Sequence, residues 1–211
     1  MAVIELDAIH VVNLKQRTDR REQISEEIKK AVVAGIFPDI EPKFVNRLSP
    51  KNGLIPPSFR GSLYYQSGCE HQRIMEDLFQ NKCDLSLILE DDAQWNPSFF
   101  SNFANFWADI QLFAPDWLAL FLGGSDMNGR TAVEGSDYVS VNNGSLQCHA
   151  YIVNRAGLYR LYDHLFVYRQ IIDWAYKDMM AEDKCCYSPT GEWFANQRAS
   201  WSDNAKKFGG G

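Results

Sequence analysis

Short apolar runs alternate with amphipathic segments along the chain, and this order predicts an α/β fold. Short apolar runs are typical of buried strands, and segments with apolar residues four positions apart are typical of helices packed on a sheet. The predicted strands are 8–14, 43–46, 84–89, 117–122, 138–141 and 147–153, and the predicted helices are 19–34, 65–81, 97–110, 154–165 and 170–181. Because strands and helices alternate, we expect a mixed, mostly parallel sheet flanked by helices.

Two regions lack a clear hydrophobic period. Segment 47–62 contains three prolines and two glycines, which predicts a long loop that is functional or mobile. The pattern beyond residue 182 is irregular. Since neither an internal repeat nor a linker is visible in the sequence, we expect one domain over 1–205, followed at 206–211 by a flexible tail or an artificial chain end.

Composition and charge narrow the class of protein. The 211 residues are 45% hydrophobic and carry a net charge of −6, so the chain is globular and does not suit binding to nucleic acid or to anionic membranes. The five cysteines are odd in number, which is typical of a reduced protein. No apolar run is long enough for a transmembrane segment, and the first residues do not resemble a signal peptide. We expect a cytoplasmic protein, at the periphery of a membrane or, if viral, in the host cytoplasm.

Three consecutive carboxylates, Glu90, Asp91 and Asp92, follow the apolar strand 84–89. Ligands of open α/β sheets bind beyond the carboxyl ends of the strands. On an extended chain Glu90 and Asp92 share one side and Asp91 takes the other, so the pair can hold a hard divalent cation together with phosphate oxygens. An acidic turn that only caps the strand has the same pattern, and the spacing alone does not decide between the two.

Two further sets of residues are candidates for chemistry. Asn13 and Leu14 end the first strand, and Arg17 and Arg20 after them can face a phosphate or a carboxylate. The spacing favours the alternative, in which both arginines are solvated residues of a helix start. Asp173 lies in an apolar setting, where burial would raise its pKa and suit it as a general base. A carboxylate at this position can equally be a helix cap.

The two candidate histidines differ in setting. His71 lies near a predicted helix start, and His149 lies within the strand 147–153. A single histidine in a strand is more often a hydrogen-bonded core residue than a ligand.

Taken in order, these features resemble glycosyltransferase family 25, the group of bacterial lipopolysaccharide galactosyltransferases and collagen galactosyltransferases. The segments that carry the resemblance are 11–21, His71 with Asp84, 87–92, 120–124, 149–157, Asp173, Pro189, Gln197, and Ser202 with Asp203. They span about residues 8–203, which is nearly the whole chain.

The resemblance implies a single-domain GT-A-like fold and a metal-dependent, inverting transfer of a hexose. The implied donor is a nucleotide sugar, a UDP-hexose, with Mn²⁺ or Mg²⁺, and the implied acceptor is a hydroxyl of a glycan or glycoprotein. It places Asp173 as the catalytic base and Glu90, Asp92 and Asp203 at the metal. It implies nucleotide-sugar-binding roles for Val12, Asn13, Leu14, Arg17, His71, Glu90, Asp91, His149 and Gln197.

Two other functions fit the same residues. An acidic strand end also serves metal-dependent phosphohydrolases and nucleotidyl enzymes, which would turn over without a sugar acceptor. A non-catalytic carbohydrate-binding domain of glycosyltransferase ancestry would bind glycans without metal or UDP.

Overall fold

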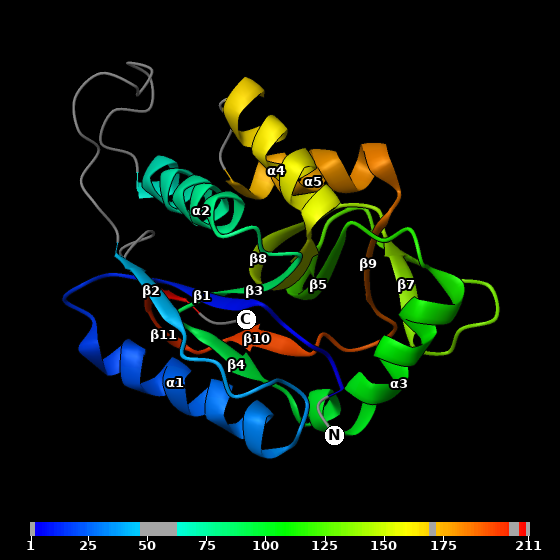
Figure 1. Cartoon of the computed structure of the whole chain (residues 1–211), viewed down its shortest axis with the longest axis horizontal. Helices are drawn as coiled ribbons and strands as arrows, with labels where there is room; N and C mark the ends of the chain where they lie inside the picture. Colours follow the sequence, from blue (N-terminus) through cyan, green and yellow to red (C-terminus); the bar gives the residue numbers. More distant parts are fainter. Residues whose placement is uncertain (1–2, 47–62, 169–171, 203–206, 210–211) are drawn as a thin grey trace.

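A mixed sheet of ten strands forms the centre of the molecule and carries helices on both faces (Figure 1). The computed structural model describes residues 3–46, 63–168, 172–202 and 207–209. In spatial order the main strands are β2 (Lys43–Asn46), β1 (Ala8–Asn13), β3 (Leu85–Glu90), β8 (Ser145–Asn154), β5 (Ala119–Asp126), β9 (Cys186–Pro189), β7 (Val139–Asn142) and β6 (Arg130–Ala132). The short strand β10 (Ala195–Gln197) pairs with both β5 and β4 (Ala93–Trp95), and β11 (Ser200–Ser202) pairs with β12 (Lys207–Gly209).

Most strands of the sheet run in one direction, which confirms the predicted fold class. Strands β2, β1 and β3 are parallel neighbours, and β9 and β10 are parallel to β5. Strand β8 lies between β3 and β5 and is antiparallel to both. The carboxyl ends of β1, β3 and β5 therefore meet the beginning of β8 at one edge of the sheet, which we call the carboxyl edge.

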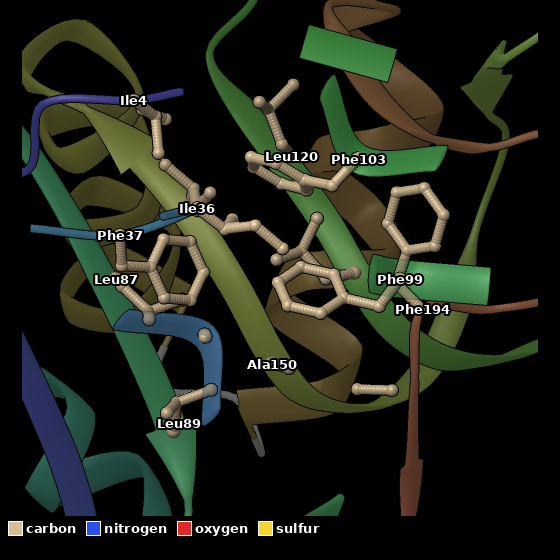
Figure 2. Packing of buried hydrophobic residues seen from close by; sticks show 14 of the residues in the cluster. Ile4, Ile36, Phe37, Leu87, Leu89, Phe99, Phe103, Leu120, Ala150 and Phe194 are labelled. Carbon is tan, nitrogen blue, oxygen red and sulfur yellow. The ribbon is translucent and has the colours of Figure 1, made fainter. Parts of the chain in front are cut away.

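Two apolar cores cover the two faces of the sheet. Helices α1 (Thr18–Val33) and α3 (Pro97–Phe113) cover one face, and α2 (Leu63–Gln80), α4 (Arg155–Tyr168) and α5 (Ile172–Asp183) cover the other (Figure 1). The predicted phenylalanine stripe of α3 is confirmed as core, and Figure 2 shows Phe99 and Phe103 packed near Phe194 and Leu120. Since side chains alternate along a strand, one strand contributes residues to both cores: Leu87 of β3 packs in the first core and Ile88 in the second.

Most predicted elements are confirmed within a few residues, but the prediction of irregular structure beyond residue 182 is wrong. Strands β9 and β10 lie there, each too short to produce a hydrophobic period. Strand β5 also continues through Gly123 and Gly124 to Asp126, past the predicted end at residue 122. Residues 207–209 of the predicted tail form β12, and the predicted loop 47–62 lies outside the described residues. The five cysteines, all within the described ranges, form no disulfide bond with one another.

Candidate functional site

The chain turns sharply after Glu90 at the carboxyl edge. Parallel pairing places Glu90 beside Val12, and the Asp91 backbone N–H donates to the Val12 carbonyl over 3.1 Å. Strand β3 ends at Glu90, and Asp91 and Asp92 form a turn that leads into β4. The expectation that Glu90 and Asp92 share one side of an extended chain is therefore wrong, because the chain is not extended there.

Asp91 and Asp92 form an acidic turn that a buried arginine compensates. Arg20 is 6% exposed, and its guanidinium donates to Asp91 over 2.9 Å and lies 3.5 Å from an oxygen of Asp92. Asn13 donates to the second oxygen of Asp91 over 2.8 Å. Of the two alternatives for Arg20, the structure supports contact with a carboxylate and excludes a solvated side chain. Arg17 instead pairs with the exposed Asp19 at 2.9 Å.

Asp92 is the carboxylate of this turn that keeps an oxygen available for a ligand. Burial and repulsion from Asp91 raise the pKa of Asp92 to about 6, against the opposing effect of Arg20. Its Oδ1 is buried and has no hydrogen-bond partner in the described part of the chain. The Arg198 backbone N–H donates to the Asp92 carbonyl over 2.7 Å and thereby fixes the turn against the end of β10. A buried carboxylate oxygen without a partner suits a cation ligand.

The described residues alone do not complete a metal site. Across the described ranges, no group of three or more His, Cys, Asp or Glu side chains could hold a metal ion. Asp203, which the resemblance places at the metal, lies outside the described residues. Asp92 therefore fits a cation site in which a ligand such as a diphosphate supplies further oxygens.

Glu90 and Asp173 lie on the other face of the carboxyl edge. Glu90 follows the alternation of β3 onto the face of Ile88, which packs in the core under α2, α4 and α5. The negative charges of Asp173 and Glu90 both help to raise the pKa of the buried Cys148 thiol, so both carboxylates lie near it. Burial raises the pKa of Asp173, and hydrogen bonds from the backbone N–H groups of Cys148 and Gln147 oppose this rise. Asp173 is thus a half-buried acid that also holds the start of β8.

A bulge interrupts β8 at this point. On β5 a single residue separates Gly123 from Ser125, but on β8 three residues separate their partners Ala150 and Leu146. The segment Gln147–His149, which has two residues more than the facing stretch of β5, forms what we call the β8 bulge. A β-bulge at the end of a strand redirects side chains, and bulges are frequent beside active sites.

His149 fastens the β8 bulge to the neighbouring strands. Its Nδ1 lies 2.6 Å from the Gln147 carbonyl oxygen, and its Nε2 lies 3.1 Å from the Ala195 carbonyl oxygen of β10. Burial lowers the pKa of His149, and these two carbonyls oppose the effect. A Cβ on Gly123 would lie only 2.3 Å from Nε2, so the glycine makes room for the imidazole. Both ring nitrogens face backbone carbonyl oxygens, and the neutral ring donates its one N–H to one of them at a time. The structure therefore gives His149 the hydrogen-bonded core role.

The other predicted site residues fall into two groups. Val12 and Asn13 are buried at the end of β1, Leu14 is half-buried just after it, and Gln197 pairs with Ala93 beside the acidic turn. His71 is only 1% exposed and lies away from solvent, where its Nδ1 is 2.8 Å from the Tyr151 hydroxyl and 3.0 Å from the Tyr176 hydroxyl.

Sequence reasoning gave contact of Arg20 with a carboxylate as one of two alternatives and favoured the other, and it missed the placement of Gln147. The only signal for Arg20 was its position on the first turns of a helix that follows a strand. No local pattern pointed to Gln147, because the β8 bulge arises from long-range pairing.

Comparison with known proteins supports a glycosyltransferase-like protein. No protein-family model matches the chain. The human protein named Inactive glycosyltransferase 25 family member 3 is 26% identical over 171 residues, which cover 75% of this chain and 29% of that protein. The chain thus spans less than a third of that relative's length.

Among solved structures, A197 from STIV matches with a TM-score of 0.50 and 14% identity over 95% of this chain and 91% of that one, which supports a shared fold only. A glycosyltransferase involved in glycosylation of the major capsid of PBCV-1 reaches 0.41 at 10% identity, over 87% of this chain and 91% of that one. UDP-glucose pyrophosphorylase complexed with UDP-glucose reaches 0.45 at 10% identity, over 90% and 75%. The last two likenesses are too distant to support a functional argument. In the described ranges, no helix is long and apolar enough to cross a membrane.

Proposed function

We propose that the protein is a glycosyltransferase that moves a hexose from a UDP-sugar, with Mn²⁺ or Mg²⁺ at the acidic turn. The observation that carries this proposal is the buried Asp92 Oδ1, which lacks a partner in the described part of the chain and lies in a turn at the carboxyl edge. A buried carboxylate oxygen that lacks a hydrogen-bond partner gains when a cation binds it.

The proposed donor site lies along the ends of β1 and β3. Asp92 would hold the cation, with Glu90 and Asp203 as further candidate ligands, and the cation would neutralise charge on the departing diphosphate. Asp91 is already engaged by Arg20 and Asn13, so it would keep the turn in place. The further residues that we propose for the nucleotide sugar are Val12, Asn13, Leu14, Arg17 and Gln197. The buried His71 and His149 would support this site from within the fold without touching the nucleotide sugar.

The proposed transfer step needs a base on the face of the sugar opposite the leaving group. The acceptor hydroxyl of a glycan or glycoprotein would form the new bond to the anomeric carbon as the bond to the diphosphate breaks. Its proton would go to Asp173, whose raised pKa suits it to accept one. This geometry gives inversion at the anomeric carbon.

A second candidate function is a carbohydrate-binding domain without catalysis. The observation that favours it is Arg20, a cation that already compensates Asp91 and lies 3.5 Å from Asp92. The human relative also carries the word inactive in its name. In this case sugars would bind without metal or nucleotide.

Calorimetric titration with UDP, GDP, CMP and ADP, each with and without Mn²⁺, tests the proposal. We expect UDP to bind only with Mn²⁺, and Asp92→Ala to weaken this binding by about 100-fold or more. The matched control is Glu134→Ala, which removes an exposed acid between β6 and β7 and should bind as wild type does.

The other outcomes separate the alternatives. Absence of nucleotide binding under both conditions contradicts a transferase and favours the carbohydrate-binding domain. Wild-type affinity in Asp92→Ala contradicts the metal assignment. Steady release of phosphate without a sugar acceptor would point to a phosphohydrolase.

A further inference from the structure

Gln147 adopts a backbone conformation that most residues avoid. Its φ is +56°, in the left-handed region, where a side chain other than glycine costs energy. The other non-glycine residues with positive φ are Lys82 and Lys184, within the described part of the chain. Both follow the end of a helix, α2 and α5 respectively, where a left-handed residue is a common terminator. Gln147 lies within a strand, so helix termination does not explain it.

Several parts of the fold converge to hold this conformation. The Asp173 carboxylate on α5 accepts hydrogen bonds from the N–H groups of Gln147 and Cys148. His149 holds the Gln147 carbonyl over 2.6 Å and is itself held by Ala195 of β10. Gly123 of β5 leaves the space that the imidazole occupies. The backbone is thus over-determined, while the Gln147 side chain remains exposed at the carboxyl edge.

A purely structural bulge would be served better by glycine, which adopts positive φ without steric cost. Glutamine instead presents a primary amide that both donates and accepts hydrogen bonds. Strained residues that their surroundings hold firmly are concentrated at binding and catalytic sites. The side chain is therefore the part of Gln147 that needs a functional explanation.

The surroundings of Gln147 indicate a neutral polyhydroxyl ligand. Asp173 binds the Gln147 backbone directly, and Glu90 lies near the same Cys148 thiol, so two carboxylates disfavour an anion here. Trp174 follows Asp173 on α5 and is 46% exposed, and the Lys177 ammonium lies 4.7 Å from the centroid of its ring. The part of the indole that Lys177 leaves open can pack on the apolar C–H face of a sugar. Hydroxyls for the amide and C–H groups for an aromatic ring are the two surfaces that a pyranose offers.

We propose that Gln147 is a specificity-determining residue whose amide binds hydroxyl groups of a hexose at the carboxyl edge. The inference rests on the proposed function, and it leaves two sources for the hexose, which are the donor nucleotide sugar and the acceptor glycan. The role of the β8 bulge would then be to orient this amide toward the ligand.

Saturation-transfer NMR on the full chain tests the inference, with methyl hexosides and UDP-hexoses as probes in the presence of Mg²⁺, which is diamagnetic and leaves the ligand signals sharp. We expect transfer to hexose protons in wild type and a loss of at least about fivefold in Gln147→Gly, with a melting temperature equal to or above wild type because glycine relaxes the backbone. Gln147→Asn keeps a shorter amide that tolerates positive φ and should fall between them. Lys184→Gly, a matched exposed left-handed position before β9, should match wild type.

The outcomes separate this inference from the proposed function. Loss of the hexose signals of UDP-hexose alone assigns Gln147 to the donor, and loss for methyl hexosides alone assigns it to the acceptor. Hexoside binding that depends on Gln147, without UDP binding, supports the inference and contradicts the transferase. Unchanged hexose signals in Gln147→Gly, or absence of hexose signals in wild type, overturn the inference, and retained uridine signals in either case leave the transferase standing.

Discussion

The acidic turn and the β8 bulge lie at the same edge of the sheet but are held by different forces. Asp91 and Asp92 are held by charge, through the buried guanidinium of Arg20 and the amide of Asn13. The β8 bulge is held mainly through its backbone, whose N–H groups donate to Asp173 and whose Gln147 carbonyl faces the His149 ring. Ion pairs in the turn can exchange partners when a cation or an anion binds, whereas hydrogen bonds to the backbone hold the bulge in one geometry. We expect the turn to respond to ligands and the bulge to remain rigid.

Removal of Arg20 should give the largest effect on the turn. Arg20→Ala leaves two adjacent carboxylates buried without their cation, so we expect the free energy of unfolding to fall by about 3–5 kcal/mol at neutral pH. Denaturant unfolding measures it. The control Arg17→Ala, which breaks an ion pair with the exposed Asp19, should cost less than about 1 kcal/mol. Equal losses in the two variants would show that charge does not hold the turn.

A methyl group at Gly123 should break the bulge by crowding. The new Cβ would lie 2.3 Å from His149 Nε2 and 2.8 Å from the Ala195 carbonyl oxygen, so we expect Gly123→Ala to cost about 2–3 kcal/mol. Chemical denaturation of Gly123→Ala, His149→Ala and the double variant forms a cycle. The double variant should be more stable than the sum of the single losses implies, because one clash is gone. Strict additivity would contradict the packing of His149 on Gly123.

Neutralising substitutions at the two carboxylates of the turn should change the stability of the protein in opposite directions, and the effect at Asp92 should be the smaller one. The folded-state pKa of Asp92 is about 6 against an ordinary 3.8, so the unfolded chain loses this proton first as pH rises. Stability therefore falls between about pH 4 and pH 6. Without added metal at pH 7, Asp92→Asn should stabilise by about 1–2 kcal/mol and flatten that slope. Thermal unfolding across pH measures both.

Asp91→Asn sharpens the same comparison as the matched variant. The variant loses the carboxylate that accepts hydrogen bonds from Arg20 and Asn13. We expect its free energy of unfolding to fall by about 1–3 kcal/mol. The same sign for both variants would show that Asp91 and Asp92 share one environment.

Much of the fold follows from local pattern, whereas the detail of the candidate site does not. The spacing of Phe99, Phe103 and Phe106 predicted one buried helix face, and the apolar run before Glu90 predicted a strand that ends in acid. Each of these signals is contained in a few neighbouring residues. The pairing of Arg20 with Asp91 joins positions 71 residues apart, and nothing local encodes it.

The backbone conformation of the β8 bulge could not be predicted from local sequence either. Gln147 sits in a strand that the pattern predicted correctly, yet its positive φ depends on β5, β10 and α5. Bulges arise when two strands of unequal local length are forced into one ladder. The alternation of apolar and polar residues in β8 does not indicate how β8 pairs with β5.

The place of β8 in the sheet has a consequence for synthesis of the protein. Strands β3 and β5 are made first, but they are not neighbours, and β8 fills the space between them. A nascent chain that has not yet emerged past Asn154 therefore leaves one edge of β3 and both edges of β5 unpaired, since β9 on the far side of β5 is made later still. The central ladder closes only once residue 154, the last of β8, has left the ribosome. Until then the unpaired edges of β3 and β5 are the part of the nascent chain most prone to aggregation.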